Sequence, residues 1–192
     1  MLTGVCAARP KVDWRYVNTK LNPADEPSRL STGLRLSPAV FLQVSLWGGP
    51  FALDGMSSIG TAQLDPTSGK RLPYVSLHPD QHAVGLDFFA YDLTRLAGKL
   101  YVYPPFNMVP AVLAFARESH VSGVLVCRDQ FEPLPVWASL VDWPARLQLP
   151  PGCCEIRSKK LAGFEPFRKA SALVAVRFHF PDLKRTRAPC DV

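Results

Sequence analysis

Metal-ligand and disulfide patterns are missing from this sequence. Its cysteines form no CxxC pair, and no histidine stands beside them at metal-ligand spacing, which argues against a zinc site. The five cysteines are Cys6, Cys127, Cys153, Cys154 and Cys190. Because their number is odd and no secretory signal is evident, we expect the adjacent Cys153 and Cys154 to be reduced and partly buried in an intracellular protein, nuclear or cytoplasmic.

Long apolar runs and catalytic clusters are also lacking. The longest apolar run falls far short of the roughly 20 residues that a membrane-spanning helix needs, so the sequence predicts no membrane partner. The pair Ser57-Ser58 lacks the pattern of a nucleophile elbow. The four histidines are scattered and each is interpreted as structural: His78, His82, His120 and His179.

What the chain does contain is an ordinary globular composition rich in proline. Of its 192 residues, 47% are hydrophobic and 20% are charged, which is enough for one sizeable core and one main domain. The 19 prolines predict short elements joined by frequent turns. A formal net charge of +6 favours a polyanionic partner such as nucleic acid, although a moderate surplus of Lys and Arg also serves solubility.

The order of elements predicts an α/β fold. Ser37-Pro38 starts a helix that Gly48-Gly49-Pro50 ends, and Phe51 to Asp54 form a short strand. A strand, an amphipathic helix and a second strand follow at 99–103, 108–120 and 123–127. This succession is a βαβ unit, which favours a mixed or parallel sheet with flanking helices.

Weaker patterns fill the rest of the chain. Residues 85–93 suit the period of either a strand or a helix. Residues 30–36 are interpreted as a connection, with a domain boundary after residue 36. Further short elements are expected at 12–17, 22–27, 74–76, 136–141, 153–157 and 172–180.

Two stretches end at positions suited to ligand contact, because ligands of open α/β sheets lie outside the carboxyl ends of the strands. Asp54 either accepts hydrogen bonds from a ribose or an amino group, or caps the turn into Gly55. In Tyr103-Pro104-Pro105-Phe106, the prolines either hold Phe106 ready to stack on a base or form a rigid turn with packed aromatics.

The order of these features resembles phage-type adenine methyltransferases. In that family an acidic residue after the first strand lies in the S-adenosylmethionine site, and a motif of Asn or Asp, Pro, Pro, and Tyr or Phe binds the adenine. The resemblance implies a Rossmann-like, methyltransferase-like fold. It also implies a cofactor site formed by Phe51, Leu53 and Asp54. The catalytic base pocket would be formed by Tyr103, Pro104, Pro105 and Phe106.

The sequence departs from that family in two places. Tyr103 stands where the motif has an amide or carboxylate, and a phenol does not reproduce the same acceptor geometry toward an adenine amine. Only Gly55 follows the first strand, where the family has a glycine-rich loop. We therefore expect no methyl transfer; the alternative is an active S-adenosylmethionine-dependent adenine DNA methyltransferase.

A second resemblance lies near the N-terminus. The segment 22–29, Asn-Pro-Ala-Asp-Glu-Pro-Ser-Arg, looks like the end of the ribonuclease H domain of retroelement reverse transcriptases. In that family the Asp is the last of four carboxylates that hold two magnesium ions. Asp25 is the matching residue, and the other three carboxylates would precede Met1. Asp25 is thus interpreted as a vestigial metal ligand, with magnesium expected only in a complete ribonuclease H domain.

Together the two segments are similar to the polyproteins of DIRS-like, tyrosine-recombinase retrotransposons. The predicted division is a ribonuclease H remnant and linker at 1–36, a methyltransferase-like domain at 37–180 and a basic tail at 181–192. The predicted function is a retroelement-derived fragment associated with nucleic acid and with other polyprotein domains. Basic runs at 157–160, 168–169 and 184–187 either follow a phosphate backbone or are solvated faces.

Overall fold

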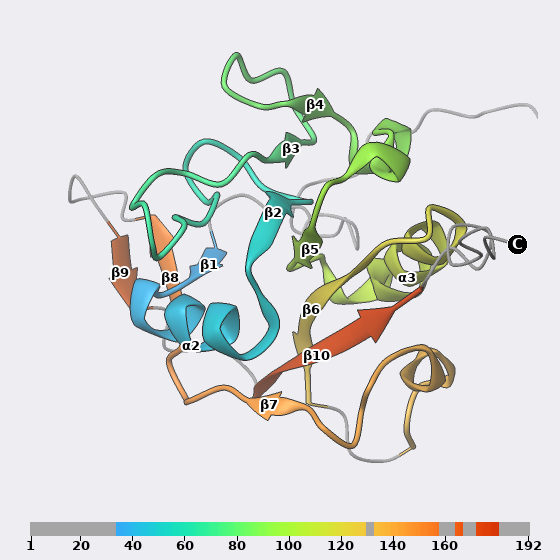
Figure 1. Ribbon diagram of the computed structural model, residues 1–192. Coiled ribbons are helices and arrows are strands. Elements are labelled where there is room, and N and C mark those ends of the chain that lie inside the picture. The colour runs from blue at the N-terminus through green and yellow to red at the C-terminus, as the bar shows by residue number, and fades with distance from the viewer. Residues whose placement is uncertain (1–33, 130–132, 158–163, 167–171, 181–192) are drawn as a thin grey trace, which may run out of the picture.

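A mixed β-sheet forms the centre of the computed structural model, which describes residues 34–129, 133–157, 164–166 and 172–180 (Figure 1). Its strands are ordered β2-β5-β6-β10-β7, with the bounds Phe51–Asp54, Lys99–Val102, Ser122–Arg128, Leu173–His179 and Leu147–Gln148. The first three strands are parallel, whereas β10 runs antiparallel to both β6 and β7. The predicted α/β class with a mixed sheet is therefore confirmed at this level.

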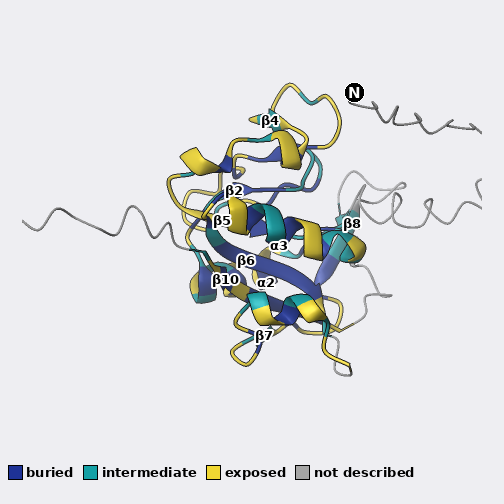
Figure 2. Cartoon of the chain, turned by 90° about the vertical axis from the view of Figure 1, so that its right-hand side faces the viewer, coloured by how far each residue is buried: buried dark blue, intermediate teal, exposed yellow. Residues whose placement is uncertain are grey.

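Two helices, α2 (Pro38–Gly48) and α3 (Val109–Glu118), cover opposite faces of this sheet (Figure 1). Successive residues of a strand point to opposite faces. Along β5, Leu100 and Val102 accordingly join the core beneath α3, while Tyr101 joins the core beneath α2. Figure 2 shows the consequence: β6 and β10 are buried along most of their length.

Helix α2 begins and ends where the sequence predicts. Ser37 is its extended N-cap and Pro38 occupies the first helical position, where its missing N–H removes no bond. At the other end, the N–H of Gly49 donates to the carbonyl of Ser45 at 2.8 Å. A Cβ at Gly48 would collide with the side chain of Val124, so close packing on β6 also requires glycine at the end of the helix.

The segment β5-α3-β6 is the predicted βαβ unit. β5 and β6 pair in parallel, with Leu100 opposite Gly123, and a 3₁₀ turn η4 (Phe106–Met108) leads into α3. The buried residues of α3 follow helical spacing and are Val109, Val112, Leu113 and Ala116. The strand, helix and strand predicted from 99 to 127 are confirmed, with ends shifted by one or two residues.

A second, antiparallel sheet combines β1 (Leu34–Leu36), β8 (Cys154–Arg157) and β9 (Phe164–Pro166). The interpretation of residues 34–36 as part of a connection is wrong, because they form β1 and Leu36 is fully buried opposite Cys154. A strand of three residues carries too little periodicity to be recognised locally. Its pairing partner comes from the distant segment predicted as a closing strand at 153–157.

The remaining described elements are short. Residues 85–93, which suit either period, divide between a strand and two 3₁₀ turns. The predicted strand at 74–76 forms β3 (Val75–Ser76), parallel to β4 (Gly85–Leu86). The 3₁₀ turns are η2 (Phe88–Ala90), η3 (Leu93–Arg95) and η5 (Val136–Leu140). The elements expected at 12–17 and 22–27 lie outside the described residues.

Candidate functional site

The two predicted site segments lie at neighbouring strand ends. β2 and β5 are parallel neighbours, and Asp54 pairs with Tyr101 in their register. Tyr103 and the two prolines continue β5 past the same edge of the sheet. Residues fifty positions apart are thus brought to one carboxyl edge by strand pairing, which no local pattern of the sequence encodes.

Asp54 is directed into the protein. Only 1% of its surface is exposed, and one carboxylate oxygen, Oδ2, accepts hydrogen bonds from the Ser57 hydroxyl at 3.0 Å and the Gln63 N–H at 3.1 Å. Burial raises the pKa of Asp54 to about 7, although these two hydrogen bonds act in the opposite direction. The carboxylate therefore holds the loop that follows β2 in place. This role is similar to turn capping, which is one of the two alternatives that the sequence indicates for Asp54.

The other predicted cofactor residues also pack inside. The Phe51 ring lies 5.5 Å from the Tyr101 ring beneath α2, and Leu53 belongs to the opposite core. A Cβ at Gly55 would lie 2.7 Å from atoms of both Phe88 and Val102, so the turn after β2 is closely packed. The Asp54 carboxylate is thus enclosed by the loop that follows β2.

Tyr103 turns its hydroxyl toward the small sheet. This oxygen lies 3.4 Å from Sγ of Cys154 on β8, and the neighbouring thiol of Cys153 lies 3.8 Å from that of Cys154. Burial and the nearby thiols raise the pKa of Tyr103 well above its usual range. The phenol therefore links two sheets, and the expected pair of partly buried cysteines is present as buried free thiols.

Phe106 and Arg128 form a pair that we term the edge platform. Phe106 is half-buried after the two prolines, and Arg128 is the exposed last residue of β6. The Arg128 guanidinium carbon lies 4.3 Å from the centroid of the Phe106 ring, in cation–π range. Pro104 is buried, and Pro105 is the N-cap of η4, so the ring stands on a packed support. The aromatic and the charge are thus held together at the carboxyl edge.

Several predicted features lie outside the described residues: Asp25 with its segment 22–29, the basic tail at 181–192 and most of the basic runs. Within the described ranges, no group of three or more His, Cys, Asp and Glu side chains is placed to hold a metal ion. Neither α2 nor α3, the helices of that same part of the chain, is long and apolar enough to cross a membrane.

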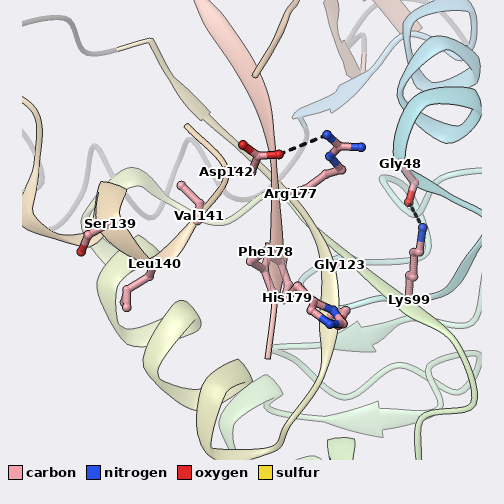
Figure 3. A pocket seen from close by; sticks show the side chains of 11 residues that line it. Gly48, Lys99, Gly123, Ser139, Leu140, Val141, Asp142, Arg177, Phe178 and His179 are labelled. Carbon is pink, nitrogen blue, oxygen red and sulfur yellow. Dashed lines mark hydrogen bonds and ion pairs between the residues drawn. The ribbon is translucent and has the colours of Figure 1, made fainter. Parts of the chain in front are cut away.

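A hollow of about 380 Å³, which we term the amino-edge hollow, lies at the other end of the parallel strands (Figure 3). Lys99 and Ser122, the first residues of β5 and β6, line it together with Arg177 and His179 of β10. The sequence predicts only a structural role for His179, and the other three residues carry no local signal. No local sequence pattern marks this group, because four separate strand positions become neighbours only in the folded sheet.

Comparison with known proteins adds no assignment to this geometry. No protein-family model matches the chain, and no curated protein sequence matches it at a significant level.

Proposed function

We propose that the chain is a retroelement-derived protein that binds single-stranded nucleic acid at the edge platform and does not transfer methyl groups. The observation that carries the binding proposal is the Arg128 guanidinium held 4.3 Å from the centroid of the Phe106 ring. Because the guanidinium lies over the ring, a base can stack on the guanidinium plane that Phe106 supports, and the positive charge attracts a phosphate.

The surroundings of the platform support single strands over duplex. Phe106 lies in a short 3₁₀ turn, and Arg128 is the last residue of a strand. Neither residue is therefore on an α-helix that would enter a major groove. Stacking on an aromatic ring requires a base that is already unstacked from its neighbours. The net charge of +6 contributes attraction that does not depend on sequence.

Two placements support the proposed absence of methyl transfer. The Tyr103 hydroxyl is directed to Cys154, away from the role of acceptor for an adenine amine. The Asp54 carboxylate is engaged by Ser57 and Gln63 beneath the surface. The catalytic and cofactor residues that the family would use thus serve packing in this chain.

Binding is tested by fluorescence anisotropy with labelled single-stranded DNA, single-stranded RNA and duplex DNA at low salt. We expect Phe106→Leu, which keeps an apolar side chain but removes the ring, to weaken single-strand binding by about five- to a hundredfold, since stacking contributes about 1–3 kcal/mol. Arg128→Gln is expected to weaken binding and to reduce its salt dependence.

The matched control is Arg95→Gln, which removes one positive charge from a side chain that is 88% exposed and paired with Asp92 on the same turn. This variant is expected to bind almost as the wild type does. Absence of binding to every probe at low salt, or equal affinity of the Phe106→Leu variant and the wild type, would refute the edge platform as the binding site.

The proposed origin has its own test. It rests on the segment 22–29 together with the Pro-Pro-Phe strand end. Genomic sequence in frame with the chain and upstream of it is expected to encode a polymerase and the three other ribonuclease H carboxylates. Upstream coding sequence of an unrelated kind would contradict the origin without affecting the binding experiment.

A further inference from the structure

We infer that the amino-edge hollow is a phosphate-binding site, used by a mononucleotide or by a backbone phosphate of a nucleic acid. It lies at the opposite end of the parallel strands from the edge platform and shares no residue with it. The inference therefore stands independently of the proposed function.

A row of polar side chains crosses three neighbouring strands at this edge. Ser122 pairs with His179 across β6 and β10, and its Oγ lies 2.6 Å from Nδ1 of the imidazole. Lys99 stands one residue before Leu100, which pairs with Gly123, so it is the neighbour of Ser122 on the third strand. Adjacent strands are about 4.8 Å apart, so the ammonium, hydroxyl and imidazole border one small area.

Arg177 adds a second permanent positive charge to the same face. It lies two residues before His179 on β10, and side chains two positions apart in a strand share a face. Its guanidinium lies 4.7 Å from the Trp47 ring centroid and donates to Asp142 at 3.1 Å. The N–H of Asp142 donates in turn to the Arg177 carbonyl at 2.8 Å, so the carboxylate is held where it orients the guanidinium.

The charge balance of the hollow favours an anion. Lys99 and Arg177 supply two positive charges, whereas Asp142 supplies one negative charge. Nζ of Lys99 donates to the carbonyls of Gly48 and Gly49 at 2.9 and 3.1 Å, which holds the ammonium at the end of α2 (Figure 3). An ammonium has three donors, so one is still available to a ligand oxygen. Both cations are thus oriented before a ligand arrives.

The shape of the hollow suits more than an inorganic ion. A volume of about 380 Å³ lies in the range of small-molecule sites, about 300–1,000 Å³. Leu140, Val141 and Phe178 provide an apolar wall beside the charged row, against which a base or ribose can pack. A phosphate with an organic group attached therefore fits both parts of the lining.

The test is isothermal titration of the full chain with inorganic phosphate, adenosine 5′-monophosphate and adenosine. We expect the monophosphate to bind more tightly than phosphate and adenosine not to bind measurably. Arg177→Gln and Lys99→Gln are each expected to weaken monophosphate binding by about tenfold or more, the usual loss for a charge-assisted hydrogen bond. Arg95→Gln, at an 88% exposed side chain that lies outside both the hollow and the edge platform, is expected to leave it unchanged.

Lys99 and Arg177 also stabilise the fold, so a second pair of variants is needed. Ser122→Ala and His179→Gln remove polar groups from the row. Thermal melting checks that each variant is folded. If a single-stranded oligonucleotide still competes with adenosine 5′-monophosphate in the Phe106→Leu variant, the site binds backbone phosphates. If the oligonucleotide does not compete, the site binds free nucleotides. The inference is overturned if the folded wild type binds neither phosphate nor the monophosphate, or if all four variants bind as the wild type does.

Discussion

The hydroxyl of Tyr103 lies 3.4 Å from Sγ of Cys154, and this contact joins the end of β5 to β8 of the small sheet. The contact explains why a phenol occupies the first position of the Pro-Pro-Phe segment. Its ring packs against the core beneath α2, and its oxygen contacts the Cys154 thiol there.

Tyr103→Phe tests this structural role. Loss of a weak hydrogen bond to sulfur is expected to lower the free energy of unfolding by at most about 1 kcal/mol, without changing affinity for nucleic acid. Urea denaturation and anisotropy measure the two quantities. Tyr74→Phe is the matched comparison, because the Tyr74 hydroxyl donates to the Asp80 carboxylate at 2.6 Å and its loss is expected to cost more. A clear fall in nucleic-acid affinity in the Tyr103→Phe variant would contradict the assignment.

Asp54→Asn is expected to change how stability depends on pH. The pKa of Asp54 is raised from 3.8 to about 7 in the folded protein, so the folded state holds its proton more tightly than the unfolded state does. Its stabilising contribution is complete below pH 4 and is lost as the pH rises to about 7. One pKa unit corresponds to about 1.4 kcal/mol, so the wild type should lose about 2–3 kcal/mol relative to Asn between pH 5 and pH 8.

The measurement is urea denaturation of both proteins at several pH values. Asn retains a carbonyl oxygen that can accept from Ser57 and Gln63, so it isolates the effect of the charge. Parallel pH profiles for the two proteins would show that Asp54 does not titrate in this range and would contradict its raised pKa.

S-adenosylmethionine is expected to leave the melting temperature unchanged at millimolar concentration. A ligand that binds only the folded state stabilises it by mass action, and about 2.7 kcal/mol is gained at a hundred times the dissociation constant. Differential scanning fluorimetry makes the comparison. A rise in melting temperature that Asp54→Ala abolishes would instead support the adenine methyltransferase alternative.

Gly123→Ala is expected to destabilise the protein strongly. The added Cβ would collide with the carbonyl oxygen of Leu100 and lie 2.8 Å from the Phe178 ring, at the pairing of β5 with β6. Overpacking of this kind costs about 1–3 kcal/mol or more. Gly69→Ala is the control, because no atom lies within 4 Å of its Cβ and only the positive φ of 66° opposes the change. Thermal melts that rank the two variants in the reverse order would disprove the predicted clash.

Local sequence patterns predicted much of the fold around the sheet. The proline after Ser37 and the paired glycines at 48 and 49 predicted both ends of α2, and the apolar spacing from 108 to 120 predicted α3. These signals act over a few residues, because caps, prolines and helical periodicity concern near neighbours in the chain. β1 was missed because its pairing partner is more than a hundred residues away.

In the candidate sites, local sequence and tertiary structure also determine different features. The chain by itself determined which residues end β2 and β5, and strand pairing then placed them side by side at one edge. Only the tertiary structure decided that Asp54 and the Tyr103 hydroxyl point inward, that Arg128 covers Phe106, and that four strand residues share a hollow at the opposite edge. Side-chain direction depends on the register and burial of strands distant in sequence, and a local pattern contains neither.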